Sequence, residues 1–317
     1  MSSFSILGIG GIYEDVMLMV PHFPHEDSKL RATSRKTCLG GNIPNTLGVL
    51  SQILINEKED KWRLFFMGAL GDDESSAVAD LSIPELKHLW HENICPVDKI
   101  GKNYPVLSWI HIEGRNCEVL LNVLEMITVS DTRSMKYNEM ISIDFERPGR
   151  KGLRELFRFA NVAFISKEYA RSIAMQENAD NSQLLTNTDV VRGFLKNIGN
   201  ELMKTTVGYI TVGSEGCYVF VAQKSVHARA VVFQESGCLE DGWLFFHLSV
   251  SNDISSGGPV VETTGAGDTF IAAVIYGLGV LKLNPVQAGK LGNIVAGKKC
   301  LQEGYDGVWK DVEIASY

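Results

Sequence analysis

Short apolar segments recur along the chain, and segments with helical spacing lie between them. The apolar segments predict strands at residues 4–9, 63–67, 106–112, 140–145, 162–166 and 207–212. The spacing predicts helices at residues 45–55, 192–203, 269–281 and 285–301. Strands that are apolar on both faces and alternate with helices are typical of a parallel sheet covered on both sides. The sequence therefore predicts an α/β fold.

Two segments break this alternation. Residues 20–35 are polar and rich in turn residues, which predicts a protruding flap, and residues 223–259 are irregular, which predicts surface structure. No internal repeat and no low-complexity linker divides the 317 residues. We therefore expect a single domain over residues 1–317.

The charge and hydropathy exclude several classes of partner. The formal net charge is −8 and the isoelectric point is about 5.5, which disfavours a nucleic-acid partner. No apolar run reaches the length of a membrane span, and the first residues do not resemble a secretory signal. The six cysteines form no C-x-x-C pair and no zinc-like spacing with histidine. We expect a cytoplasmic protein with no membrane partner and no metal held by the chain alone.

The sharpest local motif is ETTGAGDTF at residues 262–270, which precedes an apolar helix. Glycines around a small residue allow a tight turn whose N–H groups point one way, and the N-terminus of a helix favours an anion such as phosphate. Asp268 then stands beside this cradle as a candidate general base. The alternative is a glycine-rich helix cap with Asp268 in the first turn.

A second motif, GGNIPN at residues 40–45, leads into a predicted helix. Its two asparagine amides offer donors and acceptors to the hydroxyls of a polyol. The alternative is a turn with Asn45 as the helix N-cap. Asp15 and Asp27 are either ligands of the same molecule or ordinary solvated acids.

Motifs of other enzyme classes are missing from the sequence. Residues 8–11 read GIGG, but Tyr13 occupies the third glycine position of a dinucleotide fingerprint, so an NAD-dependent dehydrogenase ranks far behind. The sequence has no Walker phosphate loop, no H-E-x-x-H and no G-x-S-x-G.

With both glycine motifs in this order, about 225 residues apart, the chain resembles the PfkB/ribokinase family of sugar kinases. Within that family it is similar to the ketohexokinases. The segments that carry this narrower resemblance are HEDS (25–28), WIHIEGRN (109–116), FISK (164–167), VAGKKC (295–300) and GYDGV (304–308). The resemblance extends over residues 4 to 308, nearly the whole chain.

The resemblance implies a ribokinase-like, mainly parallel sheet flanked by helices, with a small β lid over the sugar, and ATP and Mg²⁺ as cofactors. It implies that Asp268 deprotonates the sugar hydroxyl, and that Gly265, Ala266 and Gly267 form an anion hole for the transferring phosphoryl group. No metal ligand is carried over. The residues implied for the sugar are Asp15, Asp27, Gly41, Asn42, Asn45 and Arg115. Those implied for the nucleotide are Gly213, Glu215, Gly216, Asn293 and Ala296.

The chain departs from the family pattern in the lid. We expect a lid segment at about residues 12–37 and a shortened second one at about residues 82–105, because about 35 residues of the family pattern are missing before residue 106. The resemblance implies phosphoryl transfer from ATP to a sugar hydroxyl, with fructose to fructose 1-phosphate as the first expectation. The alternative is a lid-deficient pseudokinase that binds nucleotide or sugar without efficient turnover. A homodimer through the lid, with Asp27 reaching the partner's site, is a further expectation.

Overall fold

A computed structural model gives the structure of the chain. It describes residues 4–22, 29–56, 62–68, 107–129, 140–175, 185–225, 227, 237–250 and 258–312. Asp27 and the expected second lid segment at residues 82–105 lie outside these ranges. None of the helices in the described ranges is long and apolar enough to cross a bilayer.

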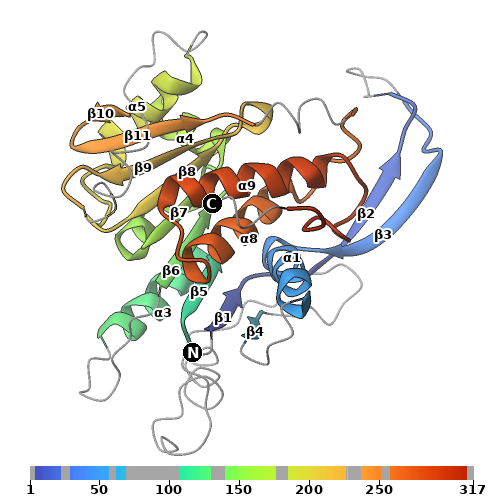
Figure 1. Cartoon of the computed structure of the whole chain (residues 1–317), viewed down its shortest axis with the longest axis horizontal. Helices are drawn as coiled ribbons and strands as arrows, with labels where there is room; N and C mark the ends of the chain where they lie inside the picture. The colour runs from blue at the N-terminus through green and yellow to red at the C-terminus, as the bar shows by residue number, and fades with distance from the viewer. Residues whose placement is uncertain are drawn as a thin grey trace, which may run out of the picture.

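A nine-stranded sheet forms the centre of the molecule, in the order β10-β11-β9-β8-β7-β6-β5-β1-β4 (Figure 1). The parallel strands are β1 (Phe4–Ile9), β4 (Trp62–Met67), β5 (Trp109–Glu113), β6 (Met140–Phe145), β7 (Val162–Ile165) and β8 (Val207–Thr211). The antiparallel strands are β9 (Cys217–Ala222), β10 (Cys238–Glu240) and β11 (Trp243–Leu248). The predicted α/β fold with a mainly parallel sheet is confirmed.

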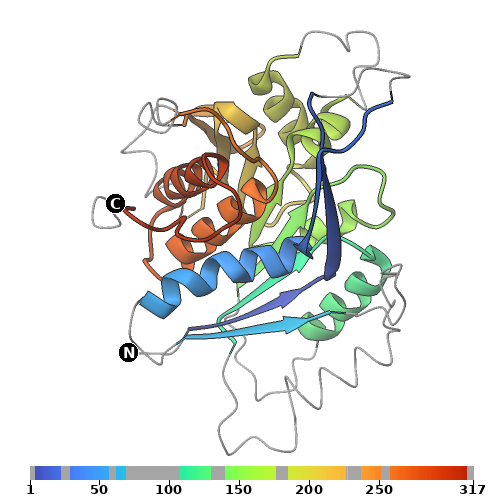
Figure 2. The same cartoon turned by 90° about the vertical axis from the view of Figure 1, so that its right-hand side faces the viewer.

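Helices cover both faces of this sheet, as Figure 2 shows for α1, α8 and α9 on one side and α3 on the other. The first face carries α1 (Asn42–Asn56), α8 (Ala266–Gly279) and α9 (Pro285–Cys300). The opposite face carries α3 (Cys117–Val129), α4 (Lys167–Ala174), α5 (Asn187–Ile198) and the 3₁₀ helix η3 (Arg154–Phe159). Successive strand residues such as Ile6 and Leu7 enter opposite cores, which explains why the strands are apolar throughout.

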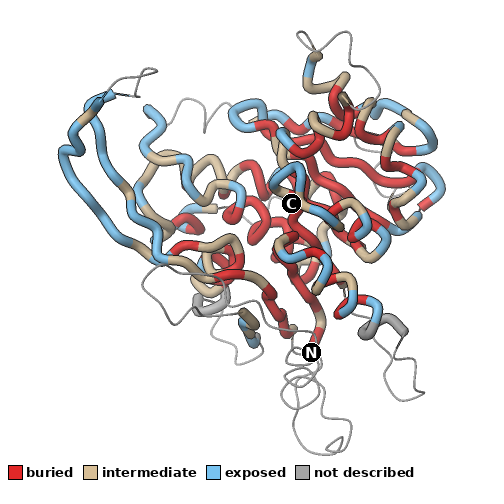
Figure 3. Tube along the Cα trace, turned by 180° about the vertical axis from the view of Figure 1, so that it is seen from behind, coloured by how far each residue is buried: buried red, intermediate tan, exposed pale blue. Residues whose placement is uncertain are grey.

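A two-stranded antiparallel ribbon projects from this body (Figures 1 and 3). It consists of β2 (Tyr13–Met19) and β3 (Ser34–Gly40), and we call it the lid ribbon. Asp15 pairs with Cys38 on one face of the ribbon, and Val16 pairs with Thr37 on the other. The segment expected to form a lid, residues 12–37, thus contains β2 and the first part of β3.

The structure corrects several predicted boundaries. Residues 223–259 are not wholly irregular, because they contain β10 and β11, and β11 is an inner strand of the sheet. The helix predicted at 45–55 begins at Asn42, so Asn45 lies inside α1 and is not its N-cap. The helix predicted at 192–203 is α5, which begins five residues earlier because Thr186 and Asp189 form a capping box. The strand predicted at 106–112 is β5, which begins at Trp109.

Candidate active site

A polar cavity of about 350 Å³ lies at the carboxyl ends of the parallel strands, beside the lid ribbon. Ligand sites of open α/β sheets occupy this edge. Eight of the residues predicted from the two glycine motifs and the resemblance line this one cavity: Asp15, Gly41, Asn42, Asn45, Arg115, Gly265, Gly267 and Asp268. The fold thus brings together residues that are up to 253 positions apart in the sequence.

Asp268 lies in the first turn of α8 and is almost completely buried. The Asn45 amide, from α1, donates a hydrogen bond of 2.7 Å to Asp268 Oδ2. Burial raises the pKa of Asp268 well above its usual range; the Asn45 hydrogen bond acts in the opposite direction, and the nearby Asp144 carboxylate adds to the rise. A carboxyl group with a raised pKa is a stronger base for a substrate proton.

The glycine turn, residues 262–267, leads directly into α8. Gly265 is its N-cap and adopts a φ of 74°, a left-handed conformation that favours glycine. Ala266 and Gly267 begin the helix, where the dipole favours an anion, although the Ala266 amide itself donates to the Thr263 carbonyl at 3.1 Å. Asp268 therefore follows directly after the residues for which the motif predicts an anion site.

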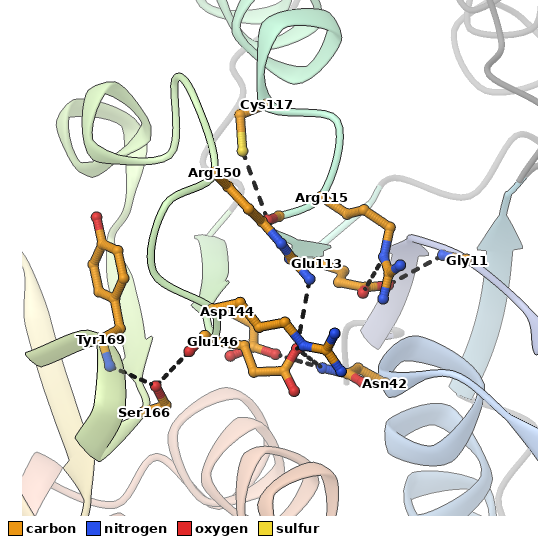
Figure 4. A network of polar contacts seen from close by, with 12 residues as sticks. Gly11, Asn42, Glu113, Arg115, Cys117, Asp144, Glu146, Arg150, Ser166 and Tyr169 are labelled. Carbon is orange, nitrogen blue, oxygen red and sulfur yellow. Dashed lines mark hydrogen bonds and ion pairs between the residues drawn. The ribbon is translucent and has the colours of Figure 1, made fainter. Parts of the chain in front are cut away.

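Two further carboxylates line the same cavity, and sequence reasoning did not identify them. Figure 4 shows Asp144 and Glu146 beside Asn42, whose Nδ2 lies 2.9 Å from Asp144 Oδ2 and 3.4 Å from Glu146 Oε2. Burial raises the pKa of Asp144 to about 7 against the opposing hydrogen bond from Asn42. The available signal was a charged residue at the carboxyl end of a strand that is otherwise apolar.

Arg115 is held by a buried carboxylate that was also missed. Arg115 Nε lies 2.7 Å from Glu113 Oε1, and the Glu113 side chain is fully buried (Figure 4). The other oxygen of Glu113 accepts a hydrogen bond of 3.2 Å from the Gly11 amide, just before the lid ribbon. The Arg115 guanidinium also lies 4.7 Å from the centroid of the Tyr13 ring, a cation–π contact. These contacts orient Arg115 toward the cavity.

A second cavity, of about 530 Å³, lies between the β8–β9 turn, β11, α8 and α9. Gly213, Gly216, Asn293 and Ala296, all predicted for the nucleotide, line it. Asn293 is part of its wall, because its Nδ2 donates to the Leu248 carbonyl at 2.7 Å. Glu215 does not line this cavity: its side chain is exposed and accepts a hydrogen bond from Asn187.

The two cavities meet at the start of α8. Gly267 and Thr211 line both, whereas Ala266 lines only the second and Asp268 only the first. An anion bound at the glycine turn would thus lie between a polar cavity and a largely apolar one. This arrangement suits transfer of a phosphoryl group from a donor in one cavity to an acceptor in the other.

Comparison with solved structures identifies the fold. The chain has the fold of ribokinase from Giardia lamblia, with a TM-score of 0.67 at 15% identity over 97% of this chain and 96% of that one. Ribokinase from Cryptococcus neoformans, solved in complex with ADP, gives a TM-score of 0.58 at 13% identity over 98% and 100%. The protein therefore has the ribokinase-like fold.

Comparison of sequences makes the assignment narrower. No protein-family model matches the chain. The chain is 27% identical to ketohexokinase from Mus musculus over 346 aligned residues, which cover 97% of this chain and all of the relative. These comparisons support a carbohydrate kinase of the PfkB/ribokinase family, and the chain is similar to ketohexokinase over nearly its whole length.

Proposed function

We propose that the chain transfers the γ-phosphoryl group of ATP to a hydroxyl of a neutral sugar, with fructose to fructose 1-phosphate as the first candidate reaction. The observation that carries this proposal is the meeting of two cavities at Gly267, with Asp268 in one of them. The similarity to mouse ketohexokinase supports fructose as the acceptor.

In the proposed mechanism the sugar occupies the polar cavity and Asp268 accepts the proton of the attacking hydroxyl. The raised pKa of Asp268 suits this role, because it makes the carboxylate a stronger acceptor of that proton. The N–H groups of the glycine turn face the phosphoryl group, whose negative charge is spread over its oxygens during transfer. Asn45 keeps the Asp268 carboxyl in a fixed orientation through its 2.7 Å hydrogen bond.

The side chains of the polar cavity favour an uncharged polyol. Asp15, Asn42 and Asn45 offer acceptors and donors at hydroxyl-binding positions, and Arg115 is already paired with Glu113. Asp144 and Glu146 add carboxylates to the same wall. Arg147 also lines this cavity, but it lies 3.8 Å from Glu146, so both cations of the wall are paired with acids. An acceptor that already carries a phosphate or carboxylate would be disfavoured by the remaining acids.

ATP with Mg²⁺ is the proposed donor, and the second cavity is its proposed site. Among the residues that the structure describes, no group of three histidine, cysteine or acidic side chains is placed to hold a metal. This fits Mg²⁺, which is commonly bound by phosphate oxygens and water with only one or two carboxylates. Gly213, Gly216 and Ala296 would let the nucleoside approach the backbone closely, while Glu215 would contact it only from outside the cavity.

We also propose a homodimer through the lid ribbon, in the cytoplasm. Val16, Leu18 and Leu39 share the ribbon face opposite to Asp15, and each is about half exposed or more. This apolar strip also carries Glu14, Thr37 and Arg35 as its cross-strand neighbours, and a strip of this kind on a projecting ribbon suits a second copy of the chain. The expectation that Asp27 reaches the partner's site concerns a residue outside the described ranges.

The pseudokinase alternative remains a second candidate because the described lid ribbon has only two strands. A coupled assay of ADP release with Mg²⁺-ATP, with and without fructose and ribose, separates the two. Release stimulated by fructose supports the kinase. Thermal stabilisation by ATP with no sugar-dependent release, and no phosphorylated sugar by mass spectrometry, would instead support the pseudokinase.

A further inference from the structure

A buried ion pair anchors the start of the glycine turn. Lys299, on α9, has a fully buried side chain, and its ammonium lies 2.7 Å from Glu262 Oε2, three residues before Gly265. The same oxygen accepts a 2.9 Å hydrogen bond from the Gly304 amide. Burial acts to raise the pKa of Glu262, but the hydrogen bonds from Lys299 and the Gly304 amide, together with the charge of Lys299, outweigh it, so the pKa lies below its ordinary value.

Tyr305 holds the turn from the other side. A Cβ atom at Gly265 would lie 1.8 Å from the Tyr305 hydroxyl oxygen, so the phenol rests directly on the glycine backbone. The Lys299 ammonium lies 5.4 Å from the centroid of the Tyr305 ring, a cation–π contact. The amides of Val261 and Glu262 also donate to the Cys300 carbonyl. The C-terminal end of α9 and the loop after it thus contact the turn at Glu262 and again at Gly265.

Stability alone does not account for a lysine buried at this place. Replacing a buried ion pair by apolar residues of similar volume is often neutral or stabilising, because removing both charges from water is costly. The geometry of an anion site is far more demanding, since displacement by about 0.5 Å weakens its hydrogen bonds. Gly265 and Gly267 have no side chains that could fix that geometry, so other residues must fix it.

We propose that Lys299, Glu262 and Tyr305 are positioning residues that hold the glycine turn in the conformation that binds the transferring phosphoryl group. The inference rests on the proposed phosphoryl transfer, and it adds residues that touch neither sugar nor nucleotide base. Their effect is transmitted through the backbone of the turn. It should therefore appear in kcat and in the binding of phosphates, and leave the KM for the sugar unchanged.

The first experiment measures binding and needs no turnover. Lys299→Met removes the buried ammonium, and Lys298→Met is the matched control, since the neighbouring ammonium contacts the Lys310 carbonyl instead. Calorimetry at a temperature well below unfolding gives the affinities for ATP and for adenosine. We expect Lys299→Met to weaken ATP about tenfold while adenosine binds as in the wild type, because only ATP places phosphates at the turn. Equal ATP-to-adenosine ratios in the two variants would overturn the inference.

The second experiment measures turnover. We expect Lys299→Met and Tyr305→Leu to lower kcat about 10- to 100-fold with the sugar KM unchanged, and Lys298→Met to leave both unchanged. In Lys299→Met the Glu262 carboxylate has lost its ion-pair partner. The double variant Lys299→Met with Glu262→Gln removes this charge as well, and we expect it to show the same loss of kcat. Recovery of kcat in that double variant would assign the effect to charge alone and overturn positioning. If the wild type phosphorylates no sugar, the proposed function fails, whereas the binding experiment still decides the inference.

Discussion

At the scale of single residues, the site depends on Asp268 and on how its carboxyl group is held. Because the group is buried and accepts the Asn45 hydrogen bond, Asp268→Asn keeps the shape of the cavity and removes only the proton acceptor. We expect kcat to fall about 10²–10⁴-fold, with ADP affinity unchanged within about twofold. Steady-state kinetics and calorimetry check this. Turnover retained in the variant would show that another group accepts the proton.

Asp144 makes the stability of the protein depend on pH. Its pKa in the folded chain is about 7, against an ordinary 3.8, so between these values the folded protein holds a proton that the unfolded chain releases. The free energy of unfolding therefore decreases as the pH rises through this window, by up to about 1.4 kcal/mol per pH unit from this group. Asp144→Asn should remove that contribution, so its curve should fall less steeply than that of the wild type.

Denaturant titrations of both proteins at pH 5, 6, 7 and 8 measure the difference. His111 has the opposite effect. Burial lowers its pKa to about 3, so its contribution to the free energy of unfolding increases as the pH rises from about 3 to about 6.5. This term is present in both proteins and cancels when their free energies are subtracted. Parallel curves for the two proteins would contradict the assignment to Asp144.

At the scale of helices and strands, α5 shows why its predicted boundary was wrong. The amphipathic pattern predicted a helix at 192–203. The capping box of Thr186 and Asp189 instead begins the helix at Asn187. Thr186→Ala should lower the free energy of unfolding by about 1 kcal/mol, because the N-cap side chain satisfies a helix amide. Thr188→Ala does not test the same effect, since its hydroxyl bonds to Tyr218. Chemical denaturation measures the loss, and kcat should not change.

The sheet core was predictable because each parallel strand is apolar on both faces and bordered by polar sequence. The active-site acids were predictable only in part. Asp268 follows two glycines, so its place beside an anion site could be read locally. Glu113 and Asp144 are 31 positions apart in the sequence and are partners across β5 and β6. The register between these two strands brings them together. No local pattern specifies that register, and therefore both were missed.

At the scale of the whole molecule, the lid ribbon links the active site to the proposed dimer. One face of the ribbon presents Asp15 to the polar cavity, and the other exposes Val16, Leu18 and Leu39. Both properties arise from the two-residue alternation of a strand. A change on the outer face should thus affect association without touching a cavity residue.

We expect the wild type to sediment as a dimer and Leu18→Glu to sediment as a monomer, because a charge at the outer end of the apolar strip, where Leu18 pairs with Arg35, opposes its burial. The matched control is Leu239→Glu, which places the same charge at an equally exposed leucine on β10, at the opposite edge of the molecule from β4. Analytical ultracentrifugation measures the association state. If the ribbon closes over the sugar only in the dimer, Leu18→Glu should also raise the KM for the sugar while ATP affinity stays unchanged, because the second cavity contains no ribbon residue. A wild type that is monomeric at micromolar concentration, or a Leu18→Glu variant that remains dimeric, would refute association through this face.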